Sequence, residues 1–211
     1  MKTLLLSIFL LVCFACNTNH KDATLHQNTI DKNVTATQKS SLNNLNEENH
    51  HTFAVVKRND KAINNFQVSL GIDNKVVNTT LIYSDEVYFF RTLYANNKAA
   101  TSALSVLENG AVVYKGITCT SICSKDATMC IPDKSKNFKA CTPCNSGAGD
   151  CTKRLSEGGE QITMFQDFTL YTEGSENEEI TYEILVKKYP LKAGYVVLPV
   201  SNSSYSEVNV F

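Results

Sequence analysis

The stretch Ala103–Ile117, ALSVLENGAVVYKGI, decides the fold class. Two apolar segments, Ala103–Leu107 and Ala111–Ile117, flank the sequence Glu-Asn-Gly at positions 108–110. An Asn-Gly pair accepts positive φ angles and is the strongest short-range signal for a turn between two antiparallel strands. The stretch therefore predicts a β-hairpin.

Strand patterns continue on both sides of this hairpin. Before it, Phe66–Ile72 alternates apolar with polar or small residues, and a turn signal follows at positions 73–75. After it, the acidic segment Glu173–Glu179 separates two apolar segments, which predicts a second hairpin. The other predicted strands are Val76–Tyr83, Val87–Leu93, Ile162–Thr172, Ile180–Lys187, Tyr195–Val200 and Tyr205–Val210.

The fold class follows from this spacing. No stretch shows a sustained helical period with caps, and about seven to ten short strands with turn signals between them predict an all-β fold, built as an antiparallel sandwich. Immunoglobulin-like topology is the commonest arrangement of that kind. That expectation rests on frequency alone, because the chain has no Trp and lacks the Cys-Trp-Cys core of immunoglobulin domains.

A polar tether precedes the predicted domain. From Asn17 to about Thr52 the chain is mostly Asn, Thr, Lys, Ser and Gln, and such a segment buries too little apolar surface to offset its chain entropy. We expect residues 16–52 to form a flexible tether. Residues 53–211 are long enough for one β domain, with a cysteine-rich insertion at 119–151.

An export signal begins the sequence. Lys2 is followed by an apolar run from Leu4 to Phe14 and then by Ala15 and Cys16. Crossing a bilayer takes about 20 apolar residues, so the run is too short for a membrane anchor. It fits a cleavable signal peptide at residues 1–15.

The end of this leader resembles the lipobox of bacterial lipoprotein precursors, a Leu-small-Ala/Gly-Cys motif that is cut just before its cysteine. The matching residues are Cys13-Phe14-Ala15-Cys16, with Cys13 in place of the usual Leu and Phe14 larger than the usual small residue. The resemblance implies that Cys16 is acylated, for example with palmitate, and anchors the protein to a membrane. Ordinary signal-peptidase cleavage at the same bond would leave Cys16 unacylated and the protein secreted.

Cysteine parity favours lipidation. Of eight cysteines, Cys13 leaves with the leader and six lie in the body, so an unacylated Cys16 would be an unpaired thiol in an oxidising compartment. The expected location is the cell envelope, either periplasmic or surface-exposed.

The six body cysteines have the spacing C-x3-C-x6-C-x10-C-x2-C-x6-C. Few large apolar residues lie between them, so we expect disulfides to stiffen a loop that has no core of its own. Spacing alone does not select the pairing. The predicted disulfide residues are Cys119, Cys123, Cys130, Cys141, Cys144 and Cys151.

Two other interpretations of these cysteines stay open. Four thiolates, for example Cys119, Cys123, Cys141 and Cys144, have spacings that suit a tetrahedral zinc site, although thiols of exported proteins usually oxidise. In addition, the sequence Cys-Thr-Pro-Cys at 141–144 resembles the C-x-P-C motif of thioredoxin-like oxidoreductases, which implies thiol-disulfide exchange through Cys141 and Cys144. That family starts a helix at the motif, whereas helix-hostile residues follow here.

Catalytic residues are scarce in the predicted domain. All four histidines, His20, His26, His50 and His51, lie in the predicted tether, which argues against Ser-His-Asp or Cys-His nucleophiles and His-ligated zinc. The acidic residues of segment 173–179 are typical of a solvent-exposed turn and not of a catalytic pair of carboxylates. We expect a protein that is not an enzyme and holds no cofactor or metal.

Charge and aromatic content limit the partners. The net charge of −1 gives no electrostatic footprint for nucleic acid. Nine tyrosines leave a glycan or protein ligand open, although Trp is absent. The sequence predicts an exported, lipid-anchored envelope protein with a non-catalytic binding or structural β domain.

Overall fold

A computed structural model describes residues 50–72, 75–122, 129–144, 149–156, 161–174, 179–202 and 204–211. Four predicted features lie outside the described residues: the signal peptide at 1–15, the lipidation site Cys16, the tether up to residue 49, and Cys123.

The described residues hold nine strands, two α-helices and two short 3-10 helices. The strands are β1 (Thr52–Arg58), β2 (Val76–Ser84), β3 (Val87–Tyr94), β4 (Ala99–Val106), β5 (Val112–Ser121), β6 (Cys151–Leu155), β7 (Thr163–Thr172), β8 (Tyr195–Val200) and β9 (Ser206–Asn209). The helices are α1 (Asp60–Ser69), α2 (Tyr182–Lys188), η1 (Lys134–Lys136) and η2 (Leu191–Ala193).

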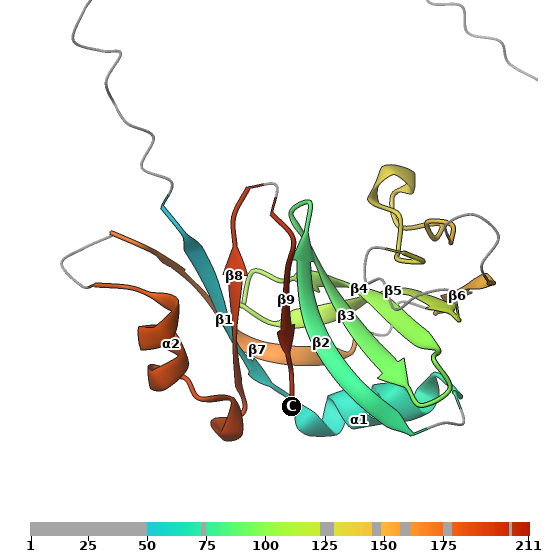
Figure 1. Ribbon diagram of the computed structural model, residues 1–211, viewed down its shortest axis with the longest axis horizontal. Coiled ribbons are helices and arrows are strands. Elements are labelled where there is room, and N and C mark those ends of the chain that lie inside the picture. The colour runs from blue at the N-terminus through green and yellow to red at the C-terminus, as the bar shows by residue number, and fades with distance from the viewer. Residues whose placement is uncertain are drawn as a thin grey trace, which may run out of the picture. The chain divides into compact units, whose positions relative to one another are not determined.

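All strand pairs are antiparallel and follow one path, in the order β8-β1-β7-β5-β4-β3-β2-β9, with β6 added to β5. The sheet curls until its two ends, β8 and β9, lie beside each other (Figure 1). The predicted all-β antiparallel fold is confirmed. Its single path differs from the ABED and CFG sheets of an immunoglobulin domain.

The hairpin predicted from the Asn-Gly pair is present between β4 and β5. Gly110 has a φ of 77°. The N–H of Leu107 donates to the carbonyl of Ala111 over 2.8 Å, and the N–H of Gly110 donates to the carbonyl of Leu107 over 2.9 Å. This is a three-residue turn with its last residue in the left-handed region, a conformation that glycine adopts without strain.

The strand predicted at Phe66–Ile72 is wrong, because most of that segment belongs to helix α1. The side chain of Asn59 caps the helix by accepting a 3.1 Å bond from the N–H of Ala62. Ile63 and Phe66, three residues apart, form the buried stripe, while Val68 is 80% exposed. Burial of Ile63 and Phe66 against the sheet stabilises the helix, although the sequence of the segment alternates as in a strand.

The strand predicted at Ile180–Lys187 is also wrong, because helix α2 occupies most of it. The side chain of Thr181 caps the helix at the N–H of Ile184, and Leu185 is its buried residue. Strand β7 therefore pairs with β1 and β5 instead of forming the expected second hairpin.

The main core fills the inner face of the curled sheet. Helix α1 contributes Ile63 and Phe66 to it, and the Phe66 ring lies 4.9 Å from the Tyr114 ring between centroids. Two smaller clusters lie on the outer face. One lies beneath the cysteine-rich segment, and the other lies between α2 and strands β1 and β8.

Candidate functional site

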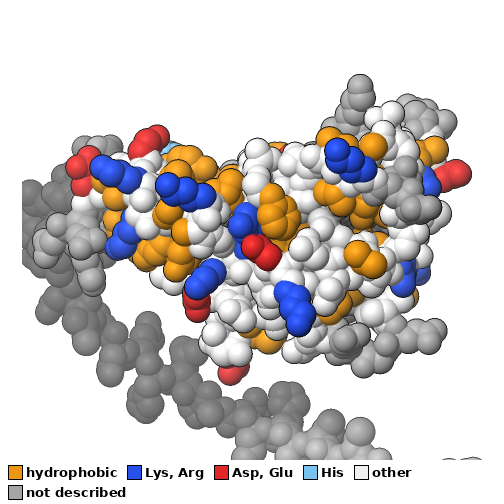
Figure 2. All heavy atoms as spheres, turned by 90° about the horizontal axis from the view of Figure 1, so that it is seen from below, with side chains coloured by type: hydrophobic (Ala, Val, Ile, Leu, Met, Phe, Trp, Pro, Cys, Tyr) orange, Lys and Arg blue, Asp and Glu red, His pale blue; other side chains and the backbone are white. Residues whose placement is uncertain are grey.

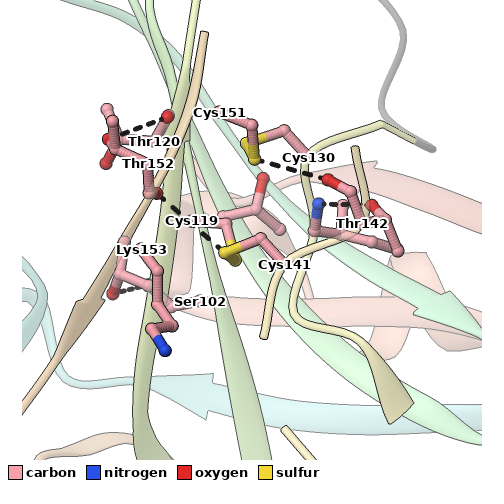
Figure 3. Close-up of a disulfide and its surroundings, with 12 residues drawn as sticks. Ser102, Cys119, Thr120, Cys130, Cys141, Thr142, Cys151, Thr152 and Lys153 are labelled. Carbon is pink, nitrogen blue, oxygen red and sulfur yellow. Dashed lines mark hydrogen bonds between the residues drawn. A yellow bond between two sulfur atoms is a disulfide. The ribbon is translucent and has the colours of Figure 1, made fainter. Parts of the chain in front are cut away.

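The chain between β5 and β6, which we call the stapled loop, is fastened to the sheet by disulfides. Cys119 of β5 bonds to Cys141 and Cys130 bonds to Cys151 of β6, with Cα–Cα distances of 5.9 and 5.6 Å (Figure 3). Both distances are ordinary for disulfides. Cys144 is disulfide-bonded as well. The predicted disulfides are therefore present at every body cysteine within the described residues.

A short antiparallel ribbon forms the centre of the stapled loop. The N–H of Thr142 donates to the carbonyl of Ile131 over 2.8 Å, and the N–H of Asp133 donates to the carbonyl of Ala140 over 2.9 Å. The Thr142 side chain accepts from the N–H of Ile131, next to the two disulfides (Figure 3). These bonds satisfy part of the loop backbone locally, between residues 131–133 and 140–142.

The apolar side chains of the stapled loop pack against the outer face of the sheet. Its cystines, Ile131 and Phe138 pack against apolar side chains of β2 to β5. This cover explains why all but one residue of β3 from Phe89 to Tyr94 is buried, so that the strand is packed on both faces. The sheet residues beneath the loop are Ile82, Val87, Phe89, Ala103, Ile117 and Cys119.

A buried arginine lies in the same row of the sheet as the first disulfide. Arg91 is 2% exposed and is the cross-strand neighbour of Thr101, which is the neighbour of Cys119. Its guanidinium donates to the Thr101 hydroxyl over 3.2 Å. A charge at this depth requires hydrogen-bond partners, and the Thr101 hydroxyl is one of them.

A cavity of about 550 Å³, which we call the loop cleft, opens between the stapled loop and the β2–β3 turn. Its wall is mostly apolar and its rim is polar, the combination found in ligand sites. The apolar wall residues are Val87, Phe89, Ile131 and Pro132, and the polar residues are Ser84, Asp85, Asp133, Lys134, Ser135 and Thr142.

Polar contacts of Lys134 join the stapled loop to the β2–β3 turn at the rim of the loop cleft. The Lys134 ammonium donates to the carbonyl of Asp85 over 2.7 Å and lies 3.4 Å from the carboxylate of Glu86. Hydrogen bonds from Ser135, opposed by desolvation and assisted by the nearby Lys136 charge, lower the pKa of Asp133. The Asp133 carboxylate on the rim is therefore ionised near neutral pH.

The disulfide pairing bears directly on the two alternative uses of the cysteines. Cys141 is bonded to Cys119, so Cys141 and Cys144 do not form the disulfide of an oxidised C-x-x-C motif. A sulfur in a disulfide is also no zinc ligand, because zinc binds thiolates. Within the described residues, no three His, Cys, Asp or Glu side chains gather as metal ligands.

The last two histidines lie closer to the fold than the sequence indicates. The carbonyl of His51 accepts a 2.8 Å bond from the N–H of Glu173, so the β1–β7 ladder continues past Thr52. A side chain at Gly174 would come within 3.2 Å of the His50 ring. The prediction that all four histidines lie in the tether is therefore corrected: His50 and His51 lie at the edge of the folded domain. Both are away from the loop cleft.

Sequence reasoning missed the walls of the loop cleft. Val87 and Phe89 lie on the outer face of the sheet, in the cluster against which the stapled loop packs. The available signal was the aromatic-rich segment Val87–Leu93, which lacks the polar alternation of a strand with one wet face.

Comparison with known proteins adds no relative: no family model, no curated protein and no solved structure matches the chain. Neither helix of the described residues has the length and hydropathy to span a bilayer.

Proposed function

We propose that the chain is an exported protein, anchored to the bacterial cell envelope by lipid on Cys16, that uses the loop cleft as a non-catalytic binding site. The observation that supports this is the pair of disulfides that fasten the stapled loop to β5 and β6. Disulfides of this kind persist in oxidising compartments. They keep a segment with few apolar side chains in one conformation, as a binding surface requires.

The loop cleft suits a ligand that presents one apolar group beside polar atoms. Phe89 and Ile131 supply apolar contact area at its wall, and carbonyl and carboxylate oxygens surround the mouth. A side chain of a protein partner has this chemistry, and burying it in a rigid cleft costs little conformational entropy on the side of the protein.

Lipid labelling tests the anchor. The full-length precursor is expressed in a bacterial host fed with a palmitate analogue, and we expect label on the wild-type chain and none on Cys16→Ala. Thr18→Ala is the control, because it changes a residue close to Cys16 but outside the matching residues 13–16, and it should stay labelled. Equal labelling of the Cys16→Ala variant would reject the anchor.

Thiol counting tests export independently of the lipid. Alkylation of the membrane fraction without reductant should modify none of the body cysteines, and alkylation after reduction should modify all of them. A cytoplasmic, uncleaved chain with every thiol reactive would reject the whole proposal.

Site-specific photocrosslinking tests the cleft. A photoreactive residue at Ser135, on the cleft rim, is compared with one at Asn96, which is exposed in the β3–β4 turn. We expect a discrete crosslinked product in the envelope from the Ser135 probe alone. Identical products from both positions would show that the cleft has no special role.

A further inference from the structure

A second concave site, which we call the tyrosine groove, lies over strand β8, between helix α2 and strand β9. Its volume is about 350 Å³. Three tyrosine rings line it, two from the ends of α2 and one from β8, together with polar side chains from β9. The lining residues that matter here are Tyr182, Tyr189, Tyr195, Val186, Glu207 and Asn209.

Two of these rings, Tyr189 and Tyr195, are in contact, and Tyr171 of β7 extends the row beyond the groove. The Tyr189 and Tyr195 rings lie 5.2 Å apart and the Tyr171 and Tyr189 rings 6.0 Å apart between centroids. A 2.6 Å hydrogen bond between the hydroxyls of Tyr171 and Tyr189 fixes that pair. Tyr182 is 36% exposed. Rings held this rigidly lose little entropy when a ligand stacks on them.

Cations lie over these rings. The Lys57 ammonium is 5.8 Å from the centre of the Tyr195 ring, and the Lys188 ammonium is 5.5 Å from that of Tyr189. Both distances are within the range of cation–π attraction. Neither lysine has a carboxylate within 4 Å among the described residues. Figure 2 shows the resulting mixture of hydrophobic and basic side chains on the part of this face formed by α2.

Hydrogen-bonding groups complete the opposite wall. Glu207 and Asn209 are two residues apart on β9, so both side chains point to the same outer face. The Tyr205 hydroxyl donates to the Glu207 carboxylate over 2.7 Å and orients it. The remaining carboxylate oxygen and the Asn209 amide can accept from or donate to neighbouring hydroxyls.

We propose that the tyrosine groove binds an acidic oligosaccharide. The apolar C–H face of a sugar ring stacks on Tyr182 and Tyr195, sugar hydroxyls bond to Glu207 and Asn209, and the sugar carboxylates pair with Lys57 and Lys188. The volume lies at the low end of the range for ligand sites, about 300–1,000 Å³, and suits one or two sugar units of a longer chain. The site lies apart from the loop cleft, so its failure would leave the proposed function intact.

Intrinsic fluorescence measures the binding directly. The chain has no Trp, so its emission comes from tyrosine, and a ligand on these rings changes it. The oxidised full-length protein in detergent is titrated with trigalacturonate, with maltotriose as a neutral sugar of equal length, and with triglutamate as an anion without sugar rings. We expect binding of trigalacturonate alone, weakening as salt is raised.

Matched variants locate the site. Tyr182→Ala and the double variant Lys57→Gln with Lys188→Gln should each weaken trigalacturonate binding at least about tenfold, which corresponds to about 1.4 kcal/mol. Leu170→Ala is the control for Tyr182, because Leu170 is 54% exposed and lies on the other face of the sheet beside Ala54. Lys61→Gln on α1 is the control for charge. Both controls should bind like wild type.

Four outcomes would overturn the proposal. Equal binding of maltotriose would remove the role of the lysines, and equal binding of triglutamate would reduce the groove to a patch that attracts any anion. No binding of trigalacturonate, or equal loss in the control variants, would reject the site. Circular dichroism of each variant shows whether a loss of binding reflects a loss of fold.

Discussion

The stapled loop and helix α2 cover two parts of the outer face of the same sheet by different means. The loop brings Ile131, Phe138 and its cystines to the strands, whereas α2 brings a buried Leu185 and tyrosine rings. The helix satisfies its backbone with internal hydrogen bonds and a Thr181 cap. The loop instead depends on covalent cross-links to both strands beneath it.

The difference shows what disulfides replace in this molecule. A helix with one apolar stripe gains stability from packing, and that contribution is independent of redox conditions. A segment with few apolar residues gains it by losing freedom in the unfolded state, and reduction removes that gain. The two covers should therefore respond to different perturbations, although they lie on one sheet.

The largest expected effect is the loss of the cross-links. The two disulfides join residues 22 and 21 positions apart, so each should contribute about 3 kcal/mol to the free energy of unfolding in the chain-entropy model. Cys119→Ala with Cys141→Ala, and Cys130→Ala with Cys151→Ala, should each lose about that amount in urea denaturation.

Hydrogen exchange locates this loss. The amides of Ile131, Asp133 and Thr142, which donate within the ribbon, should lose protection in both disulfide variants, whereas those of α2 should lose protection only with global unfolding. Loss of less than about 1 kcal/mol in both variants, with the ribbon still protected, would mean that packing and not the cross-links holds the loop.

The second effect belongs to the other cover. Leu185 is 2% exposed and is the buried residue of α2, so Leu185→Ala should lower the free energy of unfolding by about 3 kcal/mol. Ile184→Ala is the matched control, because Ile184 is 42% exposed on the same helix, and it should change little. Urea denaturation with and without reductant checks this. A Leu185→Ala loss that disappears in reductant would contradict the independence of the two covers.

Local signals in the sequence were enough for some elements. The Asn-Gly pair located the β4–β5 hairpin because its turn chemistry acts over a few residues, and Tyr195–Val200 matched β8 residue for residue. The two helices were missed, although Asn59 and Thr181 are ordinary N-cap residues. At Phe66–Ile72 an alternating apolar pattern outweighed the cap, and at Ile180–Lys187 the acidic turn signal of the preceding segment did.

Features that depend on contacts between distant segments could not be predicted from the sequence. The pairing of Cys119 with Cys141 depends on how β5 and the ribbon are placed in the fold, and the cysteine spacing does not determine this placement. Strand β6 has a charged sequence and exists because β5 and Cys130 hold it in place. The tyrosine groove joins side chains of α2, β8 and β9, so no single segment could indicate it.

A smaller effect is expected at the N-terminus of α2. The Thr181 hydroxyl accepts from the N–H of Ile184 over 3.3 Å, and loss of such a cap costs about 1 kcal/mol. Thr181→Ala should lower the midpoint of urea denaturation accordingly, and Thr181→Ser, which keeps the oxygen, should restore it. A Thr181→Ser variant as unstable as Thr181→Ala would show that packing of the methyl group, and not the cap, is responsible.

The smallest effect concerns the shared sheet, which serves as the reference for both covers. Tyr94 of β3 is 3% exposed, and its hydroxyl has no hydrogen-bond partner among the described residues. Tyr94→Phe removes that unsatisfied group at nearly constant shape, so stability at pH 7 should stay equal or rise by up to about 1 kcal/mol.

The stability difference between Tyr94→Phe and wild type should depend on pH. Burial raises the pKa of Tyr94 to about 12, above the 10.0 of an exposed tyrosine, so the folded state holds the proton more tightly than the unfolded state. The stability that wild type gains from holding the Tyr94 proton in the folded state is fully present below pH 10 and is lost as the pH rises toward 12. Tyr94→Phe should therefore gain on wild type across this window, measured by urea denaturation at stepped pH. A constant difference from pH 7 to pH 12 would instead show that Tyr94 ionises as an exposed tyrosine does, which would contradict its burial beneath the rest of the fold.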